Sequence, residues 1–421
     1  MESRKTIWIL NHHATEMAFQ HGGRHYYFAK YLMEKGYDVR IFCASVLHNS
    51  QEDAIDLQGS VSKELIVDGI PFVFVRIRKY RGNGLSRVLG MFDYYFNVKK
   101  ACKQYPRPDV IIGSSVHPLA CVAAIHLSKR YNCKNIVEIR DLWPESIVEY
   151  GLASSKSLLI KLLYRAEKWL YSKANAVVFT MAGGKDYITE KGWDTAHGGC
   201  VNLNKVFHIN NGVDLDAFEG NHIGNTIEDS DLVDSSSFKI VYTGSIRRAN
   251  NLDLVLDSAK LVKDLSVKFL IWGDGDQLGR LRQRLIDEEI RNVIFKGKVE
   301  KQFVPYIVSQ ADANFFVLED SPLFRFGLSL NKSFDYLAAG KPMIIVGNAS
   351  YSMIDEYHCG FHIRKATAQS FAQTVEQITN LSKVAYENMC MNAKEAAKEY
   401  DFKVLTNKLI AIIEDSDYSG L

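Results

Sequence analysis

Short apolar runs alternate with longer amphipathic segments along the whole of this 421-residue chain. Strands that alternate with helices are typical of a parallel sheet covered by helices on both faces. The first series predicts strands at Thr6–Leu10, Val39–Cys43, Pro71–Val75, Val110–Ile112, Asn135–Ile139 and Ala176–Thr180. The second series predicts strands at Lys239–Tyr242, Lys268–Trp272, Asn292–Phe295, Ala313–Val317 and Pro342–Val346.

The two series are separated by Glu219–Ser237, a stretch rich in Asp, Ser, Asn and Gly without periodicity, which predicts a linker. We therefore expect an α/β protein with two Rossmann-like, doubly wound domains, at 1–218 and 238–400. Residues 401–421 are expected to form a helix that packs back on the first domain. Ligands of such sheets bind at the carboxyl ends of the strands, so two facing domains would form a central cleft. The alternative is one α/β domain joined to an unrelated partner.

Composition narrows the class of protein. Against 51 Lys and Arg stand 49 Asp and Glu, and a net charge of +2 gives no signature of nucleic-acid binding. No apolar run approaches the ~20 residues of a membrane span, and the first residues lack a secretory leader pattern. The seven cysteines are scattered without a C-x-x-C pair, as expected for reduced thiols in the cytoplasm.

Glycine-containing turns follow several predicted strands. Gly22 and Gly23 precede a predicted helix, where close backbone approach and free amides suit phosphate or sugar oxygens. Gly244 ends another strand and is followed by Arg247 and Arg248, a candidate anion site. The alternative is that these arginines are solvated on a loop. Gly273-Asp274-Gly275 lacks the third glycine of a dinucleotide fingerprint and predicts a tight turn.

The most informative segment is residues 327–347, where a small, polar loop leads into a predicted helix. Asn331 and Lys332 lie where free helix amides and one cation would bind a diphosphate. Asp335, one turn further, would accept hydrogen bonds from both ribose hydroxyls. The alternative is an ordinary surface Asp and Lys.

Taken together in order and spacing, these segments resemble the GT-B glycosyltransferases, specifically the large retaining family numbered four. The segments are Gly22-Gly23, Ser114–Pro118, EIRDLWPES at 138–146, NNGVD at 210–214, YTGS at 242–245, WGDG at 272–275 and FDYLAAGKP at 334–342. IRDLWPES and NKSFDYLAAGKP are similar to the subgroup that builds bacterial surface polysaccharides, including lipopolysaccharide O-antigen and capsule. The resemblance implies transfer of an N-acetyl-aminosugar or hexose from a UDP-sugar to a hydroxyl of a glycan acceptor.

For the second domain, the resemblance implies that Asp335 is the ribose-binding acid at the end of an E-x7-E motif. The first acid of that motif is replaced by Gly327. Ser245 and Asn250 stand where many members place the two cations that hold the diphosphate. Arg247, Arg248 and Lys332 are the cations that would replace them. The backbone of Lys298 and Val299 would hold the base.

For the first domain, the resemblance implies that His117 faces the donor sugar, and His117 and Asp141 are the candidate catalytic residues. His12, Arg140 and Glu145 are weaker candidates for binding the acceptor. The resemblance also implies that the anomeric configuration of the sugar is retained and that no carboxylate nucleophile is required. No metal cofactor is expected, because the sequence shows no cluster of metal ligands and His12-His13 lack nearby carboxylate ligands at useful spacing.

Two basic amphipathic stretches suggest a peripheral contact with anionic membrane on its cytoplasmic face. Residues 76–107 contain nine Lys and Arg and one acid, Asp93, among large apolar side chains. Residues 156–173 are similar but are favoured as a helix that merely covers the sheet. Such a contact would suit a polyprenyl-diphosphate-linked acceptor. Alternatives to the transferase are a sugar-nucleotide epimerase and a catalytically weak nucleotide-binding partner of a transferase.

Overall fold

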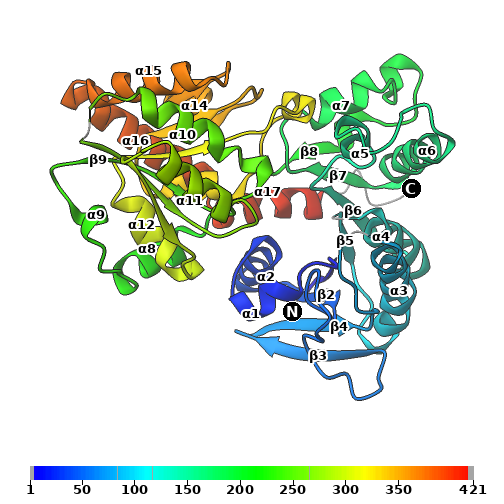
Figure 1. Ribbon diagram of the computed structural model, residues 1–421. Helices are drawn as coiled ribbons and strands as arrows, with labels where there is room; N and C mark the ends of the chain where they lie inside the picture. The colour runs from blue at the N-terminus through cyan, green and yellow to red at the C-terminus, as the bar shows by residue number, and fades with distance from the viewer. Residues whose placement is uncertain (1–3, 83, 116, 265, 416–421) are drawn as a thin grey trace. The chain divides into compact units, whose positions relative to one another are not determined.

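The computed structural model describes residues 4–82, 84–115, 117–264 and 266–415 (Figure 1). Val116, part of the Ser114–Pro118 motif, lies outside the described residues. The chain forms two compact units: Met1–Asn210 with Phe402–Leu421, and Asn211–Asp401. Each unit contains a largely parallel sheet with helices, so the predicted α/β, doubly wound fold class is confirmed.

The N-terminal unit is built on an eight-stranded sheet in the order β3-β4-β2-β1-β5-β6-β7-β8. All neighbouring strands are parallel except β3 and β4, which form an antiparallel hairpin. The strands are β1 (Thr6–Leu10), β2 (Asp38–Ala44), β3 (Ser62–Val67), β4 (Ile70–Val75), β5 (Val110–Ser115), β6 (Lys134–Ile139), β7 (Ala176–Phe179) and β8 (Val206–His208). The sequence pattern did not predict β3, whose central residues are exposed, or the three-residue β8.

Two apolar cores cover the two faces of this sheet. Along β1, Ile7 and Ile9 belong to one core and Trp8 and Leu10 to the other, as the period of a strand requires. The helices are α1 (Thr15–Gln20), α2 (Arg24–Glu34), α3 (Leu85–Ala101), α4 (Pro118–Tyr131), α5 (Glu145–Glu149), α6 (Leu158–Lys173) and α7 (Gly184–Glu190).

The C-terminal helix α17 (Phe402–Glu414) is part of the N-terminal unit. It packs on α2, where the ring of Phe402 stacks on that of Tyr27 at 5.0 Å. The buried ammonium of Lys134 donates to the carbonyl oxygens of Ile412 and Asp415 at 2.5 and 2.7 Å. A cation thus stabilises the carboxyl end of the helix.

The C-terminal unit is built on a six-stranded parallel sheet in the order β11-β10-β9-β12-β13-β14. The strands are β9 (Phe238–Thr243), β10 (Val267–Trp272), β11 (Val293–Gly297), β12 (Ala313–Val317), β13 (Met343–Val346) and β14 (Gly360–Ile363). The helices are α8 (Leu215–Gly224), α9 (Ser230–Val233), α10 (Leu252–Leu261), α11 (Leu278–Asp287), α12 (Val304–Ser309), α13 (Asn331–Ala338), α14 (Met353–Tyr357), α15 (Ala368–Thr379) and α16 (Lys383–Glu399).

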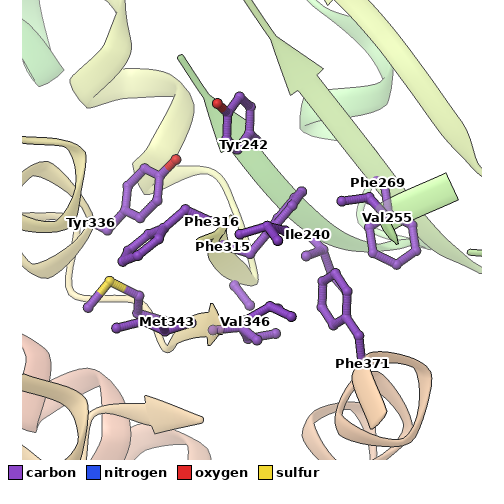
Figure 2. Packing of buried hydrophobic residues seen from close by; sticks show 14 of the residues in the cluster. Ile240, Tyr242, Val255, Phe269, Phe315, Phe316, Tyr336, Met343, Val346 and Phe371 are labelled. Carbon is purple, nitrogen blue, oxygen red and sulfur yellow. The ribbon is translucent and has the colours of Figure 1, made fainter. Parts of the chain in front are cut away.

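Aromatic side chains fill the centre of this unit (Figure 2). Phe315 on β12 lies between Phe269 on β10 and Phe371 on α15, with ring centroids 6.2 and 5.6 Å away. Tyr242 and Tyr336, which reappear in the site below, belong to the same core (Figure 2).

The segment predicted as a linker, Glu219–Ser237, is part of the C-terminal unit instead. It contains the end of α8 and all of α9, whose Leu232 is buried in an apolar cluster. Asp229 and Asp231 accept hydrogen bonds from Lys296 at 2.7 Å, an interaction that local sequence pattern cannot reveal. The division of the chain therefore falls after Asn210, ahead of the expected boundary at 218.

Among the described residues, no helix has the length and apolar character needed to cross a bilayer.

Candidate functional site

The turns that follow β9 and β10 pack backbone against backbone. The amide of Gly244 donates to the carbonyl of Trp272 at 3.0 Å, and Gly244 has a φ of 149°. A β-carbon on Gly273 would lie 1.8 Å from the carbonyl oxygen of Gly244, and one on Gly275 would lie 2.1 Å from that of Ile246. Only glycine fits at these positions, so Gly273-Asp274-Gly275 is the tight turn that the sequence predicts.

Lys332 on α13 reaches the glycine turn of β9. Its ammonium donates to the hydroxyl of Tyr242 at 3.0 Å and lies 4.2 Å from the centre of that ring. A β-carbon on Gly244 would lie 2.8 Å from Lys332 Nζ, so the ammonium lies against the turn. The Tyr242 hydroxyl in turn donates to the carbonyl of Ser245 at 2.7 Å.

The Lys332 ammonium is a partly buried charge with no counterion in the described part of the chain. Burial lowers the pKa of Lys332 to about 8, and none of the described carboxylates pairs with it. A cation held this way against a glycine turn is suited to binding an anion, because the anion would supply the missing opposite charge.

Asp335, one turn along α13, is also partly buried, and its carboxylate has no hydrogen bond among the described residues. Burial raises its pKa to about 6, and the neighbouring Lys301 opposes the increase. The next residue, Tyr336, fixes the helix to the same strand, because its hydroxyl accepts from the Thr243 amide at 3.0 Å. Tyr336 therefore anchors α13 to the end of β9, and Asp335 lies between Lys332 and Tyr336 in sequence.

The two arginines predicted near this turn are exposed, and no ion pair is described for either Arg247 or Arg248. Arg248 lines a hollow of about 520 Å³ together with acidic side chains that include Asp253 and Asp320. Ser245 and Asn250, the positions where related enzymes carry cations, are hydrogen-bonded to each other at 3.0 Å. Lys332 is therefore the predicted cation that the structure brings to Gly244.

The remaining donor-site candidates take part in fewer contacts. Lys298 is exposed just after β11, while Val299 packs on the cluster around Trp272. Asn331, the first residue of α13, is exposed. Gly297, just before Lys298, accepts from the Gly273 amide at 2.8 Å, so the ends of β10 and β11 are also joined through backbone.

In the N-terminal unit, histidines gather at the carboxyl ends of β1 and β5. His117 directly precedes α4, and its Nε2 lies 2.8 Å from Nδ1 of His12. His13 stacks on His12 at 4.7 Å, and His48 meets His13 edge-on at 4.8 Å. Burial lowers the pKa of His13 to about 2, that of His117 to about 3, and that of His12 well below its usual range. These imidazoles are neutral, and the buried Nδ1 of His117 has no hydrogen-bond partner among the described residues.

His117 and Asp141 line one small cavity of about 10 Å³, together with Ser115, Trp143 and Glu167. The hydroxyl of Ser115 accepts from the Arg140 amide at 3.2 Å, which ties β5 to the segment after β6. The structure thus brings together the two predicted catalytic residues of this unit.

Glu145 does not share that environment. It is 3 % exposed and accepts from Lys191 and Tyr164, both at 2.5 Å. These contacts give the carboxylate a structural role and lend no support to acceptor binding. No sequence motif pointed to Glu167, whose oxygens accept from the hydroxyls of Tyr171 and Tyr187.

A buried ionic network around Glu138 also escaped the sequence analysis. Glu138 accepts from Arg24 at 2.7 Å, from His25 at 2.9 Å and from Ser114 at 2.8 Å. The side-chain amide of Asn11 donates to Nδ1 of His25, which leaves His25 Nε2 as the donor to Glu138. These contacts keep the pKa of Glu138 well below its usual range despite burial.

Gly22 and Gly23 start the helix that carries Arg24 and His25 into this network. Gly23 has a φ of 102°, and a β-carbon there would lie 3.1 Å from Met17 Cγ. The two glycines therefore position α2. Arg24 follows them directly in the sequence, and this adjacency is the one sequence feature that could have drawn attention to it.

Among the described residues, no group of three or more His, Cys, Asp or Glu side chains is arranged to hold a metal ion.

Comparisons with known proteins agree with this architecture. Residues 24–197 match the glycosyl transferase 4-like domain, and residues 237–380 match glycosyl transferases group 1. A probable glycosyltransferase of Pseudomonas aeruginosa, WbjE, is 22% identical over 325 residues, which are 75% of this chain and 77% of the relative.

Two solved structures share the fold at low identity. Sucrose-phosphate synthase from Thermosynechococcus elongatus has a TM-score of 0.70 at 14% identity, covering 97% of this chain and 98% of its own. Anabaena HepE in complex with UDP and glucose has a TM-score of 0.64 at 14% identity, with the same coverage. The fold and the family matches define this chain as a GT-B glycosyltransferase. It belongs to the family 4 type, as the motifs of its sequence predict.

Proposed function

We propose that this glycosyltransferase transfers a sugar from a UDP-sugar to a hydroxyl of a glycan acceptor and retains the anomeric configuration. The observation that carries the proposal is the Lys332 ammonium, which lies against the Gly244 turn and lacks a carboxylate partner among the described residues. A nucleoside diphosphate would supply the negative charge that this cation lacks.

The proposal assigns a role to each part of the C-terminal site. Lys332 and the free amides of α13, beginning at Asn331, bind the diphosphate. Asp335 accepts hydrogen bonds from the ribose hydroxyls, which would lower its raised pKa. Other contacts proposed for the donor are Arg247 and Arg248 with the phosphates, the backbone of Lys298 and Val299 with the base, and the Gly22, Gly23 and Gly244 turns. Support comes from HepE, a protein of the same fold whose structure holds UDP and glucose.

Charge separation explains how such a site accelerates transfer without a metal. As the glycosidic bond breaks, negative charge grows on the diphosphate, and a fixed cation with oriented amides stabilises it. The acceptor hydroxyl attacks from the side of the leaving group, so no carboxylate nucleophile is needed. His117 and Asp141 hydrogen-bond sugar hydroxyls, and the neutral state of His117 leaves its Nδ1 available for that contact.

We propose a lipid-linked glycan as the acceptor, in the synthesis of a surface polysaccharide such as O-antigen or capsule. The transferred sugar is an N-acetyl-aminosugar or a hexose, and His12 and Arg140 contact the acceptor. A protein with this role works in the cytoplasm, against the inner face of the cell membrane.

The test is UDP release by purified protein over a panel of UDP-sugars, with and without a short polyprenyl-diphosphate-linked sugar. We expect one donor to give rapid UDP release that depends on the acceptor. Binding of nucleotide without turnover of any donor would identify a non-catalytic partner, and an isomerised donor without UDP release would identify an epimerase. Either result would overturn the proposal.

A further inference from the structure

The N-terminal end of α6 carries large apolar side chains that nothing in its own unit covers. Leu158, Leu159 and Leu162 are 72, 65 and 50 % exposed, and Leu152 in the preceding loop is 77 % exposed. The helix buries its opposite side, including Ile160 and the stripe of Glu167, Leu170 and Tyr171, and packs on α4 (Figure 1). The leucines are therefore not needed to hold α6 in place.

Positively charged side chains lie near these leucines in the sequence. Lys156, Lys161 and Arg165 are exposed, and no ion pair is described for any of them. Residues 150–166 contain no acid at all. Glu167 follows directly but is 4 % exposed and hydrogen-bonded to two tyrosines, so it does not offset the surface charge.

The basic stretch 76–107, which includes α3 and which the sequence favours as a membrane contact, is partly compensated in the structure. Arg78 forms a bidentate pair with Asp93 at 2.6 and 3.0 Å, and Lys79 pairs with Asp53 at 2.8 Å. Lys99 donates to the Tyr95 hydroxyl at 3.1 Å. Two of its nine cations are therefore ion-paired within the protein, although Leu85 on α3 remains 72 % exposed.

We propose that the α6 apolar end, comprising Leu152, Leu158, Leu159, Leu162, Lys156, Lys161 and Arg165, inserts into the interface of an anionic bilayer. Leucines then enter the boundary between headgroups and acyl chains while the cations contact lipid phosphates. A second copy of the chain fits this surface less well, because a symmetric contact would bring the same three cations face to face. The inference rests on the proposed function in one respect: a lipid-linked acceptor would explain why the enzyme binds a membrane.

The experiment measures flotation of the nucleotide-free protein with vesicles of phosphatidylcholine alone or mixed with phosphatidylglycerol. We expect binding to the anionic vesicles that weakens as salt rises from 0.1 to 1 M, because the Debye length falls from ~10 to ~3 Å. K156Q/K161Q/R165Q should lower the partition coefficient by about 100-fold, since each cation contributes roughly fivefold. L158Q/L159Q/L162Q should lose binding to a similar extent through lost insertion.

Two control variants separate this surface from others. V384Q/M391Q replaces exposed apolar residues of α16, 67 and 57 % exposed, and should bind vesicles like the unmodified protein. L85Q/F92Q/F96Q removes the three most exposed apolar residues of α3 and should reduce binding less than the α6 leucine variant. Release by the α3 variant but not by the α6 variants would overturn the proposal, as would absence of vesicle binding by the unmodified protein.

Further measurements keep the outcome clear. A tryptophan at Leu159 should be quenched by brominated lipid, whereas one at Val384 should not; equal quenching would contradict insertion. Sedimentation that shows a dimer lost in L158Q/L159Q/L162Q would assign the surface to a second copy and overturn the proposal. Transfer to a water-soluble acceptor should survive in both α6 variants, so loss of vesicle binding and failure of the proposed function are distinguishable.

Discussion

Replacing Lys332 with Met should weaken UDP binding and at the same time make the ligand-free protein more stable. The two effects have one cause: the ammonium is partly buried with the Tyr242 hydroxyl as its described partner and without a carboxylate. Met keeps the length of the side chain and removes the charge. A cation that serves only the fold would give the opposite sign for stability.

The magnitude of the stability change follows from the pKa of Lys332. Burial lowers that pKa from 10.5 to about 8, and each pKa unit corresponds to about 1.4 kcal/mol. With partial exposure taken into account, the charge costs the folded state about 1–3 kcal/mol at pH 7. The unfolded chain keeps its proton to higher pH, so this cost is fully present below pH 8 and disappears as pH rises from about 8 to above 10.

The loss of UDP affinity is worked from the strength of a hydrogen bond to a charged group. A bond of this kind contributes roughly 1.5–3 kcal/mol, so Lys332→Met should weaken UDP by about 10- to 150-fold. Uridine lacks the diphosphate and should bind the variant as it binds the unmodified protein.

Calorimetric titration with UDP and with uridine at pH 7, combined with thermal melting, tests both effects. Lys383→Met is the matched control, because its side chain is 87% exposed on α16 and should change neither quantity. Equal losses of affinity for UDP and uridine, or a lower melting temperature for Lys332→Met, would refute the reasoning.

Three other predictions concern the same two units. Asp335→Asn should weaken binding of uridine and of UDP by roughly 1–3 kcal/mol, measured by calorimetry. In the free protein, ionisation of the buried Asp335 lowers stability as pH rises from about 4 to 6, and the variant should not show this loss. Glu138→Gln should lower the free energy of unfolding in denaturant by about 3–5 kcal/mol, because it removes the carboxylate that pairs with the buried Arg24. Glu64→Gln at a more exposed pair should cost less than about 1 kcal/mol. Gly273→Ala should separate the β9 and β10 turns and lower both UDP affinity and melting temperature, whereas Gly279→Ala, with open space around it, should be neutral or slightly stabilising.

Much of the fold could be predicted because buried parallel strands are continuous apolar runs. Thr6–Leu10 and Ala313–Val317 coincide with β1 and β12, since every residue in them is buried. Helix α13 was also predictable, because a polar loop before an amphipathic helix has a recognisable pattern. Lys332 and Asp335 could be named as candidates for binding the donor for the same reason.

Other features depend on contacts between residues far apart in the chain. Strand β3 pairs with β4 but exposes its middle, so it lacks an apolar run. Glu219–Ser237 resembles a linker because its acids meet Lys268 and Lys296 only after folding. Glu138 gave no sign of its partners, since Arg24 lies more than a hundred residues away.

The pairing of surface charges and the exposure of surface side chains likewise could not be predicted from the sequence. The cations of residues 76–107 look uncompensated in the chain, yet Asp53 and Asp93 pair with two of them. The leucines at the start of α6 look like core positions, yet the helix buries its other side. Helical periodicity identifies an apolar face but does not say which element, if any, covers it.

Proton NMR of the product formed in the presence of a chelator tests whether the proposed transfer from a UDP-sugar is retaining and metal-independent. We expect a new glycosidic bond with the anomeric configuration of the donor sugar, formed at the same rate with and without chelator. A product with inverted configuration, or transfer abolished by the chelator and restored by a divalent cation, would contradict the proposal.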